Sequence, residues 1–338
     1  MKSLKHSFCP PLAFICSAFI LTSCTPKKNV VAFEAMNTFM TIQTYGRNGA
    51  KTNEEINKKI LNLENQLSTT LNQSYIYRIN INSGNFVEVD NETADLIGYA
   101  KKMAEITEGA LNPALYPVIK AWGFTTGNYK VPADEEIKEL LTHTDYSKIE
   151  IQDNRIKIAE KMMIDLGAIG KGYAGDCAIE IMKKNGISSA LMDLGGNVQA
   201  LGTKPDGTEW TIGIKDPSGK SAVAAIKIKD KAVITSGGYE RYFTENGKNY
   251  IHIFDGKTGY PVENDLSSVT IICDSGIYGD ALSTSLFVMG SEKAQEFWKK
   301  HKDFDVILIT KDNKIIYTNN IGNKITILGT FDQIEIWQ

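Results

Sequence analysis

The chain has 338 residues, of which 42% are hydrophobic and 23% are charged, and its formal net charge is −3. This is an ordinary globular composition, with enough length for one large domain or two small ones. The sequence has no polybasic block, which argues against nucleic acid as a partner.

The N-terminus has the features of a secretion signal. Lys2 and Lys5 form a positive start, and the apolar stretch PPLAFICSAFILTSC follows, too short for a typical membrane-spanning helix. It ends in LTSC, which resembles a bacterial lipoprotein cleavage site. We therefore expect residues 1–23 to be a lipoprotein signal peptide and Cys24 to be the lipidated start of the mature chain. An ordinary signal peptide cut nearby, or an uncleaved anchor, is the alternative.

A short tether is expected over residues 24–32, before the folded part at residues 33–338. Even fully extended, this tether would reach only about 30 Å, so the domain would lie close to a membrane. Besides Cys24, the mature chain keeps only Cys177 and Cys273. Two distant cysteines form neither a disulfide framework nor a metal-site spacing. Since both have apolar neighbours, we expect them to be small core residues.

Hydrophobic periodicity predicts a strand and three helices in the first half of the chain. The strand covers residues 36–46. A helix at 53–67 and another at 92–107 each place apolar side chains on one face, and Gly109 lies just past the second. A third helix is expected from Asn112 as N-cap, with Pro113 at its first position.

The second half mixes helices with short strands. A helix follows the glycine-rich stretch near residue 170, with apolar residues spaced i, i+3, i+4, i+7, i+8 from Ala174 to Met182, and two more are expected at 279–290 and 292–301. Gly, Asp and Pro turns separate strand-like runs, at 188–202, 209–217, 224–238, 250–255, 267–274, 305–310, 314–320 and 324–328. Without a regular β-α-β rhythm, this order favours an α+β domain with a largely antiparallel core.

The stretch IDLGAIGKGYAGD, Ile164 to Asp176, crowds four glycines around Lys171. Glycines let backbone N–H groups approach an anion closely, and the following helix offers a positive N-terminal end. These features favour a phosphate. The spacing, however, is neither a P-loop nor a dinucleotide-binding G-x-G-x-x-G. From the residues alone, a tight turn between a strand and a helix is at least as good an interpretation.

Two further groups are candidates for chemistry. Asp280 and Thr284 lie four residues apart near a helix start, so their side chains share one face and offer the hard oxygen ligands that Mg²⁺ prefers. An aspartate that simply favours the helix N-terminus is the competing interpretation. His252 is placed in a strand before a turn, where a structural role competes with that of a general base. His143 and His301 have polar surroundings, typical of solvated surface.

Six stretches taken together resemble the ApbE family, the FAD:protein FMN transferases. In order they are TEGALNPALYPVIKAWGF, IDLGAIGKGYAGD, ALMDLGGNVQALG, VITSGGYERYF, HIFDGKTGYPV and SSVTIICDSGIYGDALSTSLFVMG. The resemblance runs from about Phe33 to about Met289. It implies an enzyme that binds FAD and Mg²⁺ and transfers the FMN half to a Ser or Thr hydroxyl of a target protein, releasing AMP. Such displacement at phosphorus depends mainly on positioning and charge neutralisation.

The resemblance also implies roles for particular residues. His252 matches the family histidine that assists proton removal from the acceptor hydroxyl. The metal ligands are the carbonyl of Ala168 and the side chains of Asp280 and Thr284. FAD is bound by Met36, Thr70, Ala110, Leu111, Asn112, Asp165, Lys171 and Phe254. Ser236 and Arg241 resemble positions that line the site.

Three positions depart from the family pattern. Asn112 stands where Asp is usual, which removes a negative charge near the cofactor. Gly256 replaces the usual proline of its turn, and Thr70 stands where many relatives have an aromatic side chain that stacks on the flavin. Loss of a stacked ring costs on the order of 1 kcal/mol, which bears on how long the cofactor stays bound.

From these observations we expect a single α+β flavin transferase domain with a largely antiparallel sheet flanked by helices. We expect it on the periplasmic side of a bacterial membrane, anchored through Cys24. Its acceptor would be a flavin-carrying protein of a membrane electron-transport complex. Two alternatives stay open: an FAD pyrophosphatase that yields FMN and AMP at the same site, and a lipoprotein that stores flavin without catalysis.

Overall fold

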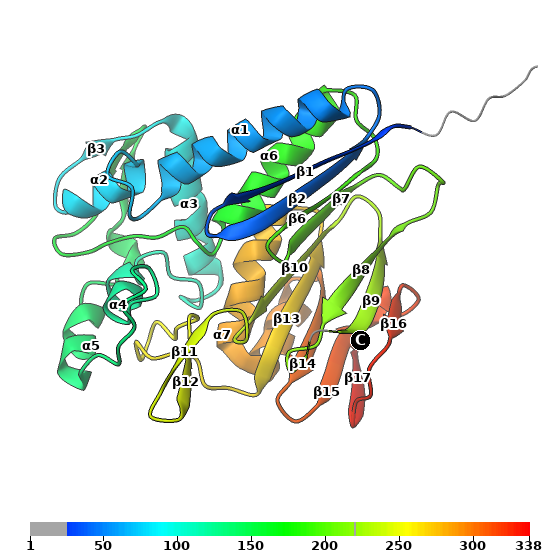
Figure 1. The fold of residues 1–338 in the computed structure, drawn as a ribbon. Coiled ribbons are helices and arrows are strands. Elements are labelled where there is room, and N and C mark those ends of the chain that lie inside the picture. The colour runs from blue at the N-terminus through cyan, green and yellow to red at the C-terminus, as the bar shows by residue number, and fades with distance from the viewer. Residues whose placement is uncertain (1–25, 220) are drawn as a thin grey trace, which may run out of the picture.

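A computed structural model describes residues 26–219 and 221–338. The expected signal peptide and its lipidation site, Cys24, lie outside the described residues. Within them the chain forms the α+β domain that the sequence predicted, with helices packed against a large sheet (Figure 1). None of the helices in these two ranges combines the length and the hydrophobicity that a membrane span requires.

The helices are α1 Gly49–Leu67, α2 Tyr75–Ile81, α3 Asn91–Ile106, α4 Tyr116–Ala121, α5 Asp134–Leu141, α6 Gly170–Lys184 and α7 Gly276–Lys300, with 3₁₀ turns η1 Tyr146–Lys148 and η2 Asn319–Ile321. The strands are β1 Lys28–Ala35, β2 Thr38–Tyr45, β3 Val87–Glu88, β4 Glu150–Gln152, β5 Arg155–Lys157, β6 Ala190–Leu194, β7 Asn197–Leu201, β8 Trp210–Lys215, β9 Ala222–Ile228, β10 Ala232–Gly237, β11 Tyr242–Glu245, β12 Lys248–Ile251, β13 Leu266–Cys273, β14 Asp305–Thr310, β15 Lys314–Thr318, β16 Ile325–Ile327 and β17 Gln333–Trp337.

A nine-stranded sheet forms the centre, in the order β1-β2-β6-β7-β10-β13-β14-β15-β17. Its strands pair antiparallel, apart from β15 with β17, which run parallel. This confirms the largely antiparallel core. The central strand β13 is buried along almost its whole length because the sheet is covered on both faces.

Helices cover one face of the sheet and a small sheet covers the other. Towards β2 and β6, the apolar faces of α1 and α6 meet in one core, as the periodicity predicted. Helix α7 packs against β10 and β13 in a second core. On the opposite face, the three-stranded sheet β16-β9-β8 buries its isoleucines against β7, β10 and β14. The two helices α6 and α7 therefore lie side by side on the sheet.

A side lobe of α2 to α5 and the small sheet β3-β5-β4 flanks this layered core (Figure 1). Beside it, the two-stranded sheet of β11 and β12 stands apart from the main sheet. Trp122, at the end of α4, joins them: its ring packs against Tyr250 and Phe254, and its indole N–H donates to the carbonyl of Gly259 at 3.0 Å. The aromatic residues of the lobe thus hold the β11–β12 hairpin in place.

Several predicted boundaries were wrong. Strand β1 begins at Lys28, so residues 28–32 belong to the sheet and not to the tether expected at 24–32. Helix α4 begins at Tyr116 and not at Asn112: the Asn112 side chain accepts from the Ala114 N–H at 2.9 Å in a turn, and Pro117 is the proline in the first helical turn.

The two helices expected at 279–290 and 292–301 are joined in α7, with a kink at Gly290, whose φ is 78°. His252 lies just after β12 and not within a strand. Cys273 is buried as expected, whereas Cys177 is only half-buried on α6, and both are free thiols. Strand β17 and the helices α2 and α5 were not predicted, because short amphipathic segments carry a weak periodic signal.

Candidate active site

The glycine-rich stretch is a tight turn that leads directly into α6. The Asp165 side chain accepts from the Gly167 N–H at 2.7 Å, and the Asp165 N–H donates to the carbonyl of Pro113 at 2.8 Å. One residue earlier, the Asn80 amide pairs with both backbone groups of Ile164. Because α6 begins at Gly170, Lys171 lies in its first turn. The tight turn is therefore confirmed, and it places a lysine at a helix N-terminus. The expected strand before it is wrong, because β5 ends at Lys157 and residues 158–166 form no strand.

Asp280 of α7 reaches the start of α6. Its Oδ2 accepts from the Gly172 N–H at 2.8 Å, and the residue is 4% exposed. One turn further along α7, the Thr284 hydroxyl lies 3.4 Å from the Ser236 hydroxyl of β10. Ser236 also pairs with the Ser283 hydroxyl at 2.8 Å. Of the predicted metal ligands, Asp280 thus lies at the first turn of α6 and Thr284 lies beside Ser236 of β10. Ala168 lies in the turn just before α6.

The charges of this region influence one another. Burial raises the pKa of Asp280, while the nearby Lys171 ammonium and the Gly172 N–H favour its ionised form. Burial likewise raises the pKa of Asp165, opposed by its bond from Gly167 and by the charges of Lys171 and Arg241. A carboxylate has about four lone-pair sites, so Asp280 can serve the helix and a divalent cation together. Carboxylate, hydroxyl and carbonyl oxygens are the donor set that suits Mg²⁺.

His252 lies at the base of the β11–β12 hairpin. Its Nδ1 is 3.1 Å from the carbonyl oxygen of Arg241, and its backbone N–H donates to the same oxygen. Since a carbonyl only accepts, Nδ1 carries the proton and Nε2 keeps a free lone pair. Burial lowers the pKa of His252 to about 4, and the Arg241 and Lys171 charges act in the same direction. The ring is therefore neutral at pH 7.

Several other predicted cofactor residues lie in turns. Met36 has a positive φ of 50° between β1 and β2, where its N–H donates to the Glu64 carboxylate at 2.8 Å. Ala110, Leu111 and Asn112 follow α3, and Leu111 is buried. The structure joins this segment to the turn of Asp165 through the Pro113 carbonyl.

Phe254 lies near His252, with Phe124 packed against both rings. It is buried and packs edge-on against Phe124 with ring centroids 5.6 Å apart. Phe124 in turn lies 6.4 Å from the His252 ring, and its carbonyl accepts from the Arg241 guanidinium at 2.7 Å. Phe254 thus supports His252 indirectly, by packing against Phe124.

Comparison with known proteins decides the family, because the family model for ApbE matches residues 36–308. The chain belongs to the ApbE family. The FAD:protein FMN transferase of Treponema pallidum is 32% identical over 294 residues, which is 81% of each chain. That of Klebsiella pneumoniae strain 342 is 34% identical, covering 76% of this chain and 81% of the relative.

Solved ApbE structures have the same fold. The crystal structure of the ApbE protein from Thermotoga maritima matches with a TM-score of 0.83 and 34% identity, covering 87% of this chain and 98% of that one. The flavin transferase ApbE from Vibrio cholerae matches with a TM-score of 0.81 and 26% identity, covering 88% and 99%. The layered α+β architecture is therefore that of ApbE flavin transferases.

Two of the three departures from the ApbE pattern lie against each other. A Cβ built on Gly256 would be 3.7 Å from the side-chain nitrogen of Asn112. The third, Thr70, is exposed in the loop after α1, and its hydrogen bonds within the described residues go to Ser68 of the same loop. The structure thus pairs Asn112 with Gly256, whereas the contacts of Thr70 stay within its own loop.

Sequence reasoning missed Glu240 at this ApbE site. Burial raises the pKa of Glu240; the charges of Lys171 and Lys215 oppose this shift, and those of Asp280 and Asp193 add to it. Glu240 lies in the stretch VITSGGYERYF, between Ser236 and Arg241. Its position between these two predicted residues was the feature of the sequence that could have identified it.

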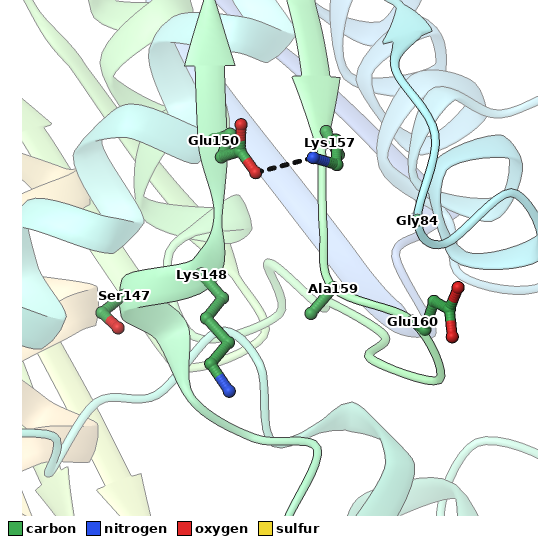
Figure 2. Close-up of a pocket in the computed structure, with 7 residues that line it drawn as sticks. All are labelled: Gly84, Ser147, Lys148, Glu150, Lys157, Ala159 and Glu160. Carbon is green, nitrogen blue, oxygen red and sulfur yellow. Dashed lines mark hydrogen bonds and ion pairs between the residues drawn. The ribbon is translucent and has the colours of Figure 1, made fainter.

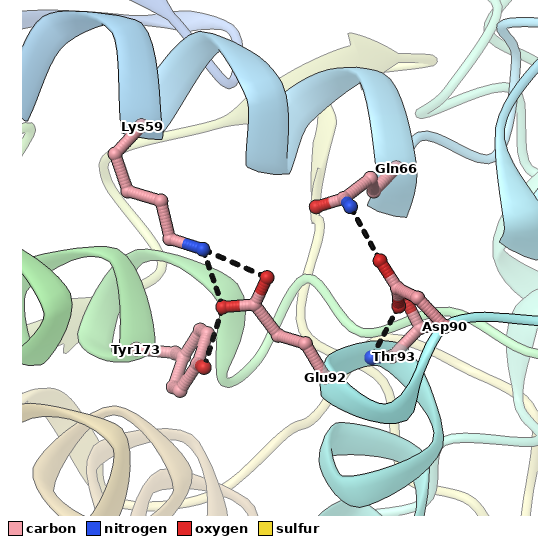
Figure 3. A network of polar contacts seen from close by, with 6 residues as sticks. All are labelled: Lys59, Gln66, Asp90, Glu92, Thr93 and Tyr173. Atoms are coloured by element: carbon pink, nitrogen blue, oxygen red, sulfur yellow. Dashed lines mark hydrogen bonds and ion pairs between the residues drawn. The ribbon is translucent and has the colours of Figure 1, made fainter. Parts of the chain in front are cut away.

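Tyr173 has a structural role that was also missed. Its hydroxyl donates to Glu92 at 2.7 Å, and Lys59 forms an ion pair with the same carboxylate, which ties α6 to α3 and α1 (Figure 3). The tyrosine two residues after Lys171 therefore anchors the first turn of α6.

A surface pocket of the side lobe contains none of the predicted residues. It is lined by Gly84, Ser147, Lys148, Glu150, Lys157, Ala159 and Glu160, and Figure 2 shows the ion pair between Lys157 and Glu150 at 2.9 Å. Its polar lining and the absence of any contact with Lys171 or His252 separate it from the chemistry described above.

Proposed function

We propose that this chain is an Mg²⁺-dependent FAD:protein FMN transferase that releases AMP. The observation that carries the proposal is the buried carboxylate of Asp280 from α7 at the first turn of α6, where it accepts from the Gly172 N–H, next in sequence to Lys171. A lysine and a cation-binding carboxylate at the same helix N-terminus suit a pyrophosphate. The relatives from Treponema pallidum and Klebsiella pneumoniae are FAD:protein FMN transferases, and FAD contains a pyrophosphate.

The residues divide the work. The Ala168 carbonyl, Asp280 and Thr284 would hold Mg²⁺, which when bound offsets negative charge on the departing phosphate. Lys171 adds a fixed charge on the same side. Met36, Asp165 and the 110–112 segment would orient FAD around this point, at the places described above.

His252 is proposed as the general base. Its Nε2 takes the proton of the acceptor hydroxyl, whose oxygen forms a bond to the phosphorus of the FMN half. The bond from that phosphorus to the AMP oxygen breaks, and AMP leaves with the electron pair. The hydrogen bond from Nδ1 to Arg241 supports this role because it fixes the tautomer and the ring orientation.

The nearest alternative is hydrolysis of FAD to FMN and AMP, with water in place of the protein hydroxyl. The exposed Thr70, which offers no ring to the flavin, is the observation that favours it. Incubation with FAD, Mg²⁺ and an acceptor separates the two. An FMN-sized mass increase of the acceptor supports transfer, and free FMN and AMP without the adduct support hydrolysis.

The metal assignment is tested with Asp280→Ala. Transfer should fall about 10²–10³-fold or more, because a charge-stabilising group is lost. The variant should still fold, as judged by circular dichroism. A folded variant with wild-type transfer would contradict the assignment.

The proposed location is the periplasmic face of a membrane, with Cys24 lipidated and the acceptor in an electron-transport complex on the same side. Since β1 begins at Lys28, the link from Cys24 spans at most about 14 Å. The site would then stay near the membrane surface. Labelling of cells with a fatty-acid probe should mark the wild type and not Cys24→Ser; a label on both would contradict lipidation at Cys24.

A further inference from the structure

Asp176, the last residue of the glycine-rich stretch, holds the beginning of the neighbouring helix. Its Oδ1 accepts from the Gly276 N–H at 2.6 Å, and its Oδ2 accepts from the Ile277 N–H at 3.0 Å. The Ser275 hydroxyl donates to Oδ2 as well, at 3.1 Å. The first N–H groups of a helix have no partner within the helix. Ser275 caps α7 by accepting from the Tyr278 N–H, and Asp176 of α6 satisfies the Gly276 and Ile277 N–H groups.

A reciprocal hydrogen bond, from α6 to a carboxylate of α7, joins the same two helices. Asp280 of α7 accepts from the Gly172 N–H of α6, just as Asp176 of α6 accepts from the Gly276 N–H of α7. Each aspartate lies four residues after the glycine of its own helix. The helices thus cross antiparallel, each giving a carboxylate to the first turn of the other. A Cβ on Gly172 would be 2.2 Å from the Gly276 carbonyl oxygen, and Gln199 donates to the Gly172 carbonyl at 3.2 Å. The crossing therefore tolerates little sliding.

We propose that Asp176 is a positioning residue for the metal centre: by fixing the start of α7 against α6, it sets Asp280 and Thr284 against the turn of Ala168. This inference rests on the proposed metal-dependent function. It predicts that loss of Asp176 weakens metal binding although Asp176 itself touches no metal.

Asp176→Asn is the informative variant. Gly276 and Ile277 donate to different oxygens of the Asp176 carboxylate; in the amide one of these positions becomes an NH2 group, which only donates, so one of the two bonds is lost. The probe is Mn²⁺ alone, which takes the same hard oxygen ligands as Mg²⁺ and whose free ion is counted by electron paramagnetic resonance. We expect Mn²⁺ affinity of the purified full chain to fall about 10–100-fold, as for other groups that orient metal ligands. FAD affinity measured without metal should change much less.

Asp265→Ala is the matched control, because an asparagine there could keep the bond through its own Oδ1. Asp265 accepts from the Ser291 N–H at 3.1 Å, where α7 resumes after its kink. Ser291 lies about 16 Å along the helix from Asp280. The same type of bond is removed from the same helix, so this variant should keep wild-type Mn²⁺ affinity. A loss as large as that of Asp176→Asn would overturn the inference, since any weakening of α7 would then suffice.

The remaining outcomes separate the inference from the proposed function. If Asp280→Ala binds Mn²⁺ as well as the wild type, the metal assignment fails and the inference with it. If Asp280→Ala loses binding while folded Asp176→Asn keeps it, only the inference fails. Should Asp176→Asn not fold, Ser275→Ala removes one of the Asp176 bonds together with the N-cap bond from Tyr278, and it should weaken Mn²⁺ binding in the same direction; unchanged affinity there would overturn the inference.

Discussion

The two walls of the candidate site are built differently. Asp280 and Lys171 come from long helices that pack on the nine-stranded sheet and cross at glycines. His252 and Arg241 come from the base of a two-stranded hairpin whose strands contain exposed and half-buried residues but no buried one. Aromatic packing against the side lobe and the hydrogen bond from Arg241 to the Phe124 carbonyl support that hairpin.

This difference indicates a division of labour. Groups on packed helices hold their geometry more closely than groups on loops. Such fixed geometry is suited to binding a pyrophosphate. The hairpin has few buried apolar contacts of its own, which is typical of segments that open at low cost in free energy. An acceptor protein that brings a hydroxyl to His252 would meet this second, less constrained wall.

The largest expected effect of a change at the hairpin is on the rate of FMN transfer. His252→Asn should lower transfer about 10²–10⁴-fold, the usual contribution of a general base, with little change in stability. Acceptor mass measured over time gives the rate. A metal affinity reduced along with the rate would show that the two walls are not independent.

The pH dependence sharpens the same comparison. The pKa of His252 is lowered from 6.5 to about 4, so the base stays unprotonated until the pH falls near 4. In the wild type, kcat/KM should therefore fall on the acid side only well below pH 6.5. This fall should be absent in His252→Asn, which identifies it as the titration of His252. Bound FAD phosphates offset the Lys171 and Arg241 charges, so the corresponding limb of kcat should lie at higher pH. A kcat/KM limb at the ordinary histidine value would contradict the buried environment.

A smaller effect is expected on the helix wall from Gly172→Ala. The added methyl group would meet the Gly276 carbonyl oxygen at 2.2 Å, so the helices must separate. Such overpacking typically costs about 1–3 kcal/mol of the free energy of unfolding, measured by urea denaturation. Gly170→Ala is the control: no atom lies within 4 Å of its Cβ, so stability should be unchanged or rise by up to about 1 kcal/mol. Equal losses in both variants would contradict a crossing set by close approach.

The smallest effect is expected in the turn after His252. Gly256 is the second residue of a turn in which the Thr258 N–H donates to the Asp255 carbonyl at 3.3 Å, a position that proline favours. Gly256→Pro should raise the free energy of unfolding by about 0.4–1 kcal/mol. Gly127→Pro, at a φ of 76°, should instead destabilise. Destabilisation by Gly256→Pro would show that this turn needs glycine.

Sequence reasoning was most successful where one segment carries its own signal. Apolar spacing predicted α1, α3 and α6, and glycines with Lys171 predicted the turn before α6. It failed where two signals competed locally, as with Pro113 and Pro117 at the start of α4, because either proline fits the first turn of a helix.

The sequence by itself determined the fold class, the family resemblance and the set of candidate residues, because periodicity and motifs are local properties of the chain. Only the tertiary structure decided the partners of those residues. Asp176 meets Gly276 across 100 residues, and Gly172 meets Asp280 across 108. A hydrogen bond between such distant segments depends on how the sheet stacks its helices, and no short stretch of sequence encodes that arrangement.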